Sequence, residues 1–185
     1  MEPGRPSHTQ LGRERLVSGG RHGSGRNPPL RVAVVGAGAA AAPVEEAAYA
    51  VGRSLAEGGA VLITGGLGGV MAAAARGCRD GGGTSIGLLP GREPGEGNPW
   101  TDLPLATGMG EGRNVLVVRA AVAVIAVGGE WGTLSEIALA RKIGRPVVIL
   151  GEPPVPGVAL PAAAGPAAAA RWALEAARKG REATG

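Results

Sequence analysis

The sequence predicts a single-domain α/β protein, a Rossmann-like doubly wound parallel sheet with helices on both faces. Two observations support this fold class. From residue 31 onward, short β-branched runs alternate with stretches of helical periodicity, the order typical of βαβ units. The runs are also apolar throughout rather than at alternate positions, as expected for strands that are covered on both faces.

Five strands and five helices follow from this alternation. We expect strands at 31–36 (RVAVVG), 60–65 (AVLITG), 84–90 (TSIGLLP), 122–127 (VAVIAV) and 146–151 (PVVILG). We expect the helices between and after them near 43–58, 68–80, 110–120, 132–144 and 165–180. The stretch 91–108 fits neither pattern and predicts a long polar connection, of the kind that often shapes a binding site. The Pro-rich stretch 151–166 predicts a second connection, into the Ala-rich last helix.

The first 29 residues differ in composition from the rest of the chain. Residues 1–29 are rich in Gly, Pro, Ser and Arg and lack apolar periodicity, so we expect a disordered basic leader before a folded domain at 30–182. The leader has five Arg and two Glu, and thus supplies most of the formal net charge of +4. Because the folded part is nearly neutral and the chain has no Phe for base stacking, we expect no nucleic-acid partner.

The few special residue types narrow the chemistry further. The leader has no apolar signal-like core and the longest apolar run, 120–127, is too short to cross a bilayer, so we expect a cytoplasmic protein without a membrane partner. Cys78 is the one cysteine, which excludes an internal disulfide. Both histidines, His8 and His22, lie in the leader, so we expect no metal site and no histidine catalysis in the folded domain.

Three Gly-rich turns, 36–43, 65–71 and 128–133, follow predicted strands and precede predicted helices. In a parallel sheet they meet at the carboxyl edge, where ligands bind. Glycines let backbone amides approach an anion and a helix N-terminus attracts it, so the second and third turns are candidate phosphate sites, with tight βα connections as the alternative. The first turn matches the dinucleotide fingerprint loosely, but Thr64 and Gly65 end the next strand without a ribose-binding acid, which argues against NAD.

Two segments carry a family resemblance: 63–91 (ITGGLGGVMAAAARGCRDGGGTSIGLLPG) and 108–150, which contains GMGEGRN and VAVIAVGGEWGTLSEIALARKIGRPVVIL. The chain resembles the Lonely Guy (LOG) family and the related molybdenum-cofactor carrier proteins, within the LOG-like Rossmann superfamily. The resemblance extends over about residues 31–180. Residues 107–114, together with Asn98, are more similar to the carrier-like bacterial branch than to plant LOG enzymes.

The LOG signature, Pro-Gly-Gly-x-Gly-Thr-x-x-Glu, aligns with residues 128–136. Four positions match: Gly129, Gly132, Thr133 and Glu136. Gly128 replaces the proline and Glu130 replaces the second glycine. Arg113 matches the family's catalytic arginine, whereas Asn114 stands where a lysine usually follows it.

The resemblance implies a site for a nucleoside 5′-monophosphate or another phosphorylated small molecule. It implies catalytic roles for Arg113 and Glu136 beside the ribose, and phosphate binding by the turn at 128–133. The candidate ligand-binding residues are Gly36, Gly65, Gly66, Gly68, Gly69, Asn98, Asn114, Gly128, Gly129, Glu130, Gly132 and Thr133. No cofactor is required, and a nucleotide or molybdenum cofactor is the bound molecule that the family suggests. The resemblance also implies a homodimer or higher homo-oligomer.

Two functions remain open at this point. The first is a phosphoribohydrolase that cleaves the N-glycosidic bond of nucleoside 5′-monophosphates, with Arg113 and Glu136 at its centre. The second is a non-catalytic carrier or sensor of molybdenum cofactor or a nucleotide, favoured by the substitutions at Gly128, Glu130 and Asn114. A carboxylate about 4 Å from a phosphate costs on the order of 4 kcal/mol near a protein surface, so Glu130 weighs against a simple LOG site. Thr133 and Glu136 also have the spacing of a helix capping box, which needs no catalysis.

Overall fold

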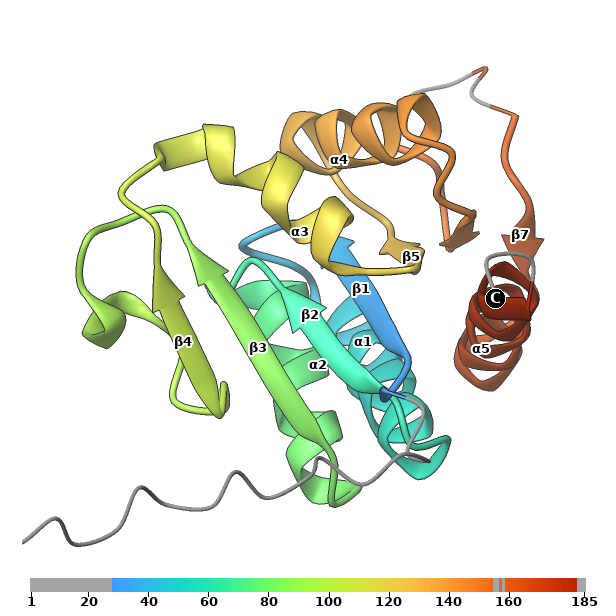
Figure 1. Ribbon diagram of the computed structural model, residues 1–185, viewed down its shortest axis with the longest axis horizontal. Helices are drawn as coiled ribbons and strands as arrows, with labels where there is room; N and C mark the ends of the chain where they lie inside the picture. The colour runs from blue at the N-terminus through green and yellow to red at the C-terminus, as the bar shows by residue number, and fades with distance from the viewer. Residues whose placement is uncertain (1–27, 155–156, 158, 183–185) are drawn as a thin grey trace, which may run out of the picture.

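A computed structural model describes residues 28–154, 157 and 159–182. Within this part of the chain, seven parallel strands form one sheet in the order β4-β3-β2-β1-β5-β6-β7. Helices cover both faces of the sheet (Figure 1). The predicted doubly wound α/β fold is therefore confirmed. Most of the predicted leader at 1–29 lies outside the described residues.

The elements follow the predicted alternation closely. The strands are β1 (Arg31–Gly36), β2 (Val61–Thr64), β3 (Thr84–Leu89), β4 (Leu103–Ala106), β5 (Ala123–Val127), β6 (Val147–Leu150) and β7 (Ala162–Ala163). The α-helices are α1 (Ala42–Glu57), α2 (Gly69–Asp80), α3 (Asn114–Ala120), α4 (Trp131–Lys142) and α5 (Pro166–Glu182). Two 3₁₀ turns, η1 (Pro94–Glu96) and η2 (Gly110–Arg113), complete the order.

Two strands were absent from the prediction. β4 lies inside the stretch 91–108 and pairs with β3, and β7 lies inside the Pro-rich connection at 151–166 and pairs with β6. Both are edge strands of at most four residues. Pro104 interrupts the sequence of β4, which is tolerated at a sheet edge, where an amide is not needed for the ladder. The prediction of an unstructured connection over 91–108 was therefore wrong for its second half.

The apolar strands hold two separate core layers together. On one face, α1, α2 and α5 pack on a cluster that includes Val34, Leu62 and Ile125. On the other face, α3 and α4 pack on a cluster that includes Val35, Ile63 and Val124. Because successive side chains of a strand alternate between faces, apolar runs supply both clusters. Among the described helices, none has both the length and the apolar character needed to cross a membrane.

The helices α1 and α2 are in direct backbone contact. A Cβ atom on Gly52 would overlap the carbonyl oxygen of Ala74, and one on Gly77 would overlap that of Tyr49. Each helix therefore places a glycine against the other's backbone. This contact fixes α2, and with it the turn between β2 and α2 that reaches the carboxyl edge.

We predict that Gly52→Ala lowers the free energy of unfolding by about 2–3 kcal/mol, because the added methyl group must push the two helices apart. Urea unfolding followed by circular dichroism measures this change. Gly180→Ala in α5 is the matched control, since its Cβ would meet no atom within 4 Å. We expect the control to be neutral or stabilising by up to about 1 kcal/mol, owing to the higher helix propensity of alanine. Equal stability of the two variants would contradict this account of the α1–α2 contact.

Candidate functional site

The candidate site lies where the strand order reverses. From β1 the chain continues to β2 on one side, and later returns to β5 on the other side. Crevices at such switch points, beside the carboxyl ends of the strands, are where ligands bind in open α/β sheets. All three Gly-rich turns reach this edge, each between the strand and the helix that the sequence predicted for it.

A cavity of about 290 Å³ occupies this position. This volume is close to the lower end of the range for small-molecule sites. Its walls come from the loop after β1, the loop after β2, η2 and the start of α4. The lining residues are Gly36, Ala37, Gly38, Leu67, Met71, Glu111, Arg113, Asn114, Glu130, Gly132, Thr133 and Glu136.

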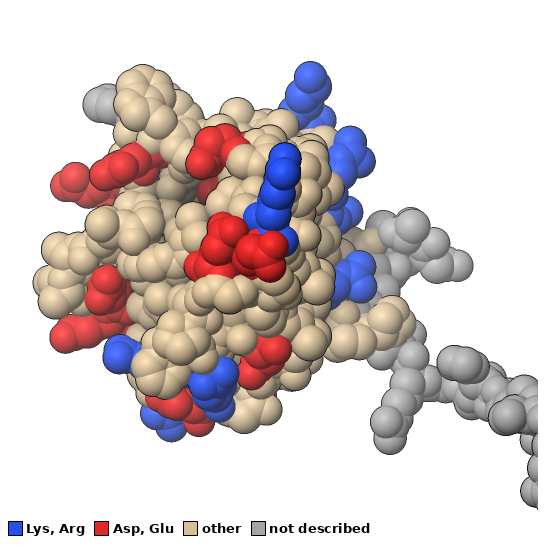
Figure 2. All heavy atoms as spheres, turned by 90° about the vertical axis from the view of Figure 1, so that its left-hand side faces the viewer, with Lys and Arg blue, Asp and Glu red and all other residues tan. Residues whose placement is uncertain are grey.

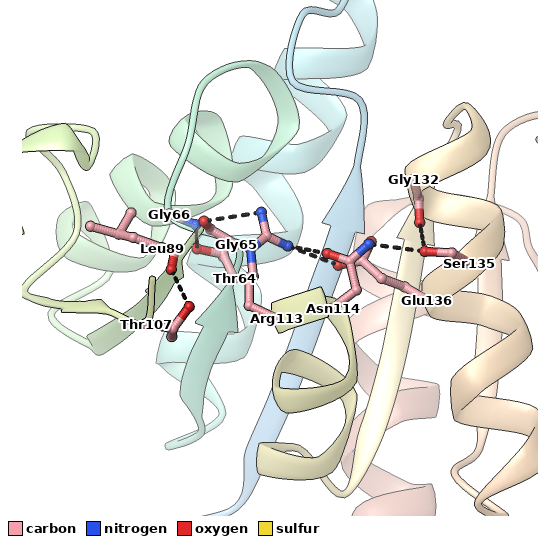
Figure 3. A network of polar contacts seen from close by, with 10 residues as sticks. All are labelled: Thr64, Gly65, Gly66, Leu89, Thr107, Arg113, Asn114, Gly132, Ser135 and Glu136. Carbon is pink, nitrogen blue, oxygen red and sulfur yellow. Dashed lines mark hydrogen bonds and ion pairs between the residues drawn. The ribbon is translucent and has the colours of Figure 1, made fainter. Parts of the chain in front are cut away.

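A buried ion pair forms one wall of the cavity. Nη1 of Arg113, at the end of η2, lies 3.6 Å from Oε1 of Glu136, in the second turn of α4 (Figure 3). Their side chains are only 6% and 7% exposed. The structure thus brings together the two residues that the sequence selected as catalytic candidates, although 23 positions separate them in the chain.

Arg113 has further partners on both sides. Its Nη2 donates to the carbonyl oxygen of Gly65 at 3.4 Å, and its Nη1 donates to Oδ1 of Asn114. A Cβ atom on residue 65 would overlap the guanidinium, so this glycine is needed for the approach. The Nε of Arg113 is buried and has no hydrogen-bond acceptor within the described part of the chain. A buried donor of this kind is a place for a ligand or water oxygen.

Asn114 connects Arg113 to the turn at 128–133. Its Nδ2 donates to Oγ of Ser135 at 2.9 Å, and that hydroxyl donates to the carbonyl oxygen of Gly132 at 2.7 Å (Figure 3). A continuous polar chain thus runs from the loop after β2, through Arg113, to the start of α4. The orientation of the guanidinium is consequently tied to the turn that is the best phosphate-binding candidate.

Glu136 titrates far from the usual range of a carboxyl group. Burial raises its pKa from 4.5 to about 7, although the nearby Arg113 guanidinium lowers it. The carboxylate of Glu111 contributes a smaller increase. Desolvation therefore outweighs the ion pair, and the side chain changes its charge near neutral pH.

The capping-box interpretation of Glu136 is wrong. The helix α4 begins at Trp131, so Thr133 is already its third residue and cannot cap it. Glu130 occupies the N-cap position, and its side chain makes no capping hydrogen bond. The carboxylate of Glu136 points instead to Arg113 (Figure 3).

Glu130 and Trp131 lie at the mouth of the site. The Glu130 side chain is exposed and lines the cavity, and the side chain of Trp131 is 80% exposed. The first amides of α4 have no partner within the helix, as at every helix start, and this is the feature of the turn that suits an anion. Glu130 therefore places a negative charge beside these amides.

Several predicted ligand-binding residues support the site without lining the cavity. Asn98 donates from its Nδ2 to the carbonyl oxygens of Gly66 and Leu67, at 3.0 Å each, and so holds the loop after β2. Positive φ angles occur at Gly66, Gly69, Gly128 and Gly129, where glycine is the favoured residue. Gly68 and Gly69 also pass so close to the Gly38 carbonyl that no side chain would fit.

Sequence reasoning missed several residues of the site. Leu67 and Met71 form the apolar part of the wall, and Glu111 stands two residues before Arg113. Ser135, at an unspecified position of the LOG signature, completes the polar chain from Asn114. Only Glu111 had a signal in the sequence, since it lies in the same glycine-flanked stretch, GEGR, as Arg113.

The surroundings of the site are acidic. Glu93, Glu96, Glu111 and Glu130 are exposed on loops and turns beyond the carboxyl ends of the strands, whereas Arg92 is the exposed cation among these segments within the described residues. Figure 2, which faces the β4 edge, shows acidic side chains in its upper half and no single basic patch there. Nowhere in the described residues do three or more His, Cys, Asp or Glu form a group suited to a metal ion.

Comparison with known proteins assigns the family. A model of the SLOG cluster4 family matches residues 29–169. The chain belongs to this family. An uncharacterized protein of Archaeoglobus fulgidus is 46% identical over 126 residues, which cover 68% of this chain and 82% of that protein. The family assignment agrees with the LOG-like resemblance that the sequence motifs indicated.

Solved structures are similar to this SLOG protein over most of its length. The Moco carrier protein from Chlamydomonas reinhardtii is 34% identical with a TM-score of 0.73, covering 82% of this chain and 99% of that one. The molybdenum cofactor binding protein of Rippkaea orientalis is 30% identical with a TM-score of 0.67, covering 86% and 98%. These similarities support a ligand-binding protein of the SLOG family.

A more distant match shares only the fold. DNA processing protein A from Helicobacter pylori, described as binding single-stranded DNA, is 24% identical with a TM-score of 0.56, covering 67% of this chain and 66% of that one. At this identity the match carries no conclusion about nucleic acid. The expectation of no nucleic-acid partner stays a prediction, and the acidic surroundings of the site support it.

We predict that the stability of the protein depends on pH through Glu136. Its pKa is raised in the folded state, so the folded protein holds this proton more tightly than the unfolded chain does. This contribution is complete below about pH 4.5 and is lost as the pH rises through about 7. Relative to Glu136→Gln, the wild type should therefore lose about 3 kcal/mol of unfolding free energy between pH 4 and pH 8.

Urea unfolding of both proteins at the two pH values measures this difference. Glu46→Gln on the exposed surface of α1 is the control, and its stability should follow that of the wild type at both pH values. Parallel pH profiles for the wild type and Glu136→Gln would show that the carboxyl group titrates normally.

Proposed function

We propose that this SLOG protein binds a phosphorylated small molecule, with the phosphate at the turn 128–133 and the remainder of the ligand in the cavity beside Arg113. One observation carries this proposal: a single cavity combines the free amides of a helix start with a buried guanidinium. Backbone amides and arginine are the two groups that proteins use most to bind phosphate. The names of the carrier and binding proteins to which the chain is similar agree with a bound ligand.

We favour a non-catalytic carrier or sensor over an enzyme. The polar chain through Asn114 and Ser135 holds Arg113 in one orientation, as suits tight binding of a preorganised ligand. Asn114 itself replaces the lysine of LOG enzymes, and Glu130 narrows the anion site. Molybdenum cofactor, which is itself phosphorylated, and nucleotides are both candidates. A cofactor beyond the ligand is not part of this proposal.

Hydrolysis of nucleoside 5′-monophosphates is the second candidate. It is favoured by Glu136, since a carboxyl group with a pKa of about 7 can hold or accept a proton at neutral pH. Cleavage of the N-glycosidic bond requires a positioned water and stabilisation of an oxocarbenium-like transition state. Glu136 would orient the water, and Arg113 would hold the ribose 5′-phosphate in place.

We also propose that the protein forms a homodimer or a higher homo-oligomer. Leu103, Leu105 and Met109, on β4 and just after it, are each about half exposed. A cluster of large apolar side chains on an edge strand is a typical contact surface. Multi-angle light scattering tests this proposal, and a monodisperse monomer would overturn it.

The decisive experiment tests AMP with purified protein, by calorimetry for binding and by chromatography for released adenine. We expect binding with an affinity that falls at least tenfold in Arg113→Ala, because the main cation of the cavity is lost. Arg119→Ala, an exposed arginine later in the same segment and outside the cavity, is the control and should bind like the wild type.

The two products of this experiment separate the two candidates. Stoichiometric binding without adenine release supports the carrier or sensor. Adenine release that Glu136→Ala abolishes supports the hydrolase. Neither binding nor release, with AMP and with other phosphorylated ligands including a molybdopterin phosphate, would overturn the proposed phosphate site.

A further inference from the structure

The charges that line the cavity do not match an anionic ligand. Three carboxylates, those of Glu111, Glu130 and Glu136, face one guanidinium, that of Arg113. The other lining residues are uncharged. With all four groups ionised, the wall is negative overall, and a phosphate dianion would add two further charges. The inference below rests on the proposed binding of a phosphorylated ligand and concerns how these charges are accommodated.

Arg113 is not free in the structure described above. Its Nη1 lies 3.6 Å from Glu136, and both side chains are more than nine-tenths buried. A phosphate that binds to this guanidinium must compete with the carboxylate of Glu136. Once the phosphate shares the guanidinium, an ionised Glu136 would be buried between an anion and Glu111, with weakened compensation.

We propose that the phosphorylated ligand displaces Glu136 from Arg113 and that Glu136 takes up one proton from solvent as this happens. Glu136 and the ligand thus compete for the same guanidinium, and protonation of Glu136 favours the ligand. Binding then weakens as the pH rises above neutrality. Glu136 acts here as a positioning residue, through its hold on Arg113.

The groups around Glu136 support this exchange. Arg113 and Glu111 face it from η2, Asn114 from α3 and Glu130 from the start of α4. The loops after β1 and β2 line the cavity only with uncharged residues. Arg113 is thus the single cation in the cavity wall. Burial already raises the pKa of Glu136 to about 7, so the proton is available near neutral pH.

The phosphate itself also titrates, with a second pKa near 6. The experiment is therefore carried out above pH 7, where the ligand no longer changes its charge. Isothermal titration of AMP, and separately of inorganic phosphate, between pH 7 and pH 9 gives the affinity. Repetition in two buffers of different ionisation enthalpy gives the number of protons bound with the ligand.

For the wild type we expect close to one proton taken up per ligand and an affinity that falls about tenfold per pH unit above pH 7.5. Glu136→Gln should bind without proton uptake and with a flat pH profile. Glu46→Gln, on the exposed surface of α1, should retain the behaviour of the wild type. The proton count of the wild type needs no variant, so the test stands even if Glu136→Gln folds poorly.

Two outcomes would overturn the proposal. The first is ligand binding by the wild type without proton uptake, which would mean that Glu136 keeps its charge. The second is an equal pH dependence in Glu136→Gln, which would place the titration elsewhere. Absence of binding by either probe at every pH would instead overturn the proposed function itself, and the two failures are thereby distinguishable.

Discussion

The buried ion pair between Arg113 and Glu136 is the interaction on which the candidate site depends. Two charged groups removed from water are stable only when geometry and hydrogen bonds compensate for their desolvation. Here the loop after β2 supplies a carbonyl oxygen, and Asn114 supplies an amide oxygen. Loss of any of these partners would leave a buried charge. The site is therefore constrained from three segments that are distant in sequence.

This constraint explains several glycines and polar residues that have no chemistry of their own. Gly65 lacks a side chain where the guanidinium passes, and Asn98 holds the loop that carries it. Ser135 joins the arrangement to the start of α4. These residues lie at or near the motifs that place the chain in the SLOG family. Their common feature is the support of one arginine.

How much of this was readable from sequence depended on the range of each interaction. The five central strands and the Gly-rich turns were predicted, since apolar runs and turn residues are local signals. Strands β4 and β7 were not, because short edge strands with partly exposed side chains lack such a signal. Arg113 and Glu136 were selected through the family motifs, but their contact required the packing of α3 against α4. The start of α4, two residues earlier than a capping box requires, decided the interpretation of Glu136.

The two helical layers are held by different kinds of contact, and this has a consequence for motion. On one face, α1 and α2 meet through their backbones at Gly52 and Gly77, which leaves no free volume for sliding. On the other, the polar contact between α3 and α4 at the site is a chain of side-chain hydrogen bonds that water can replace. Local opening should therefore be concentrated in the layer of α3 and α4. The rigid layer then acts as a frame against which the ligand-binding side adjusts.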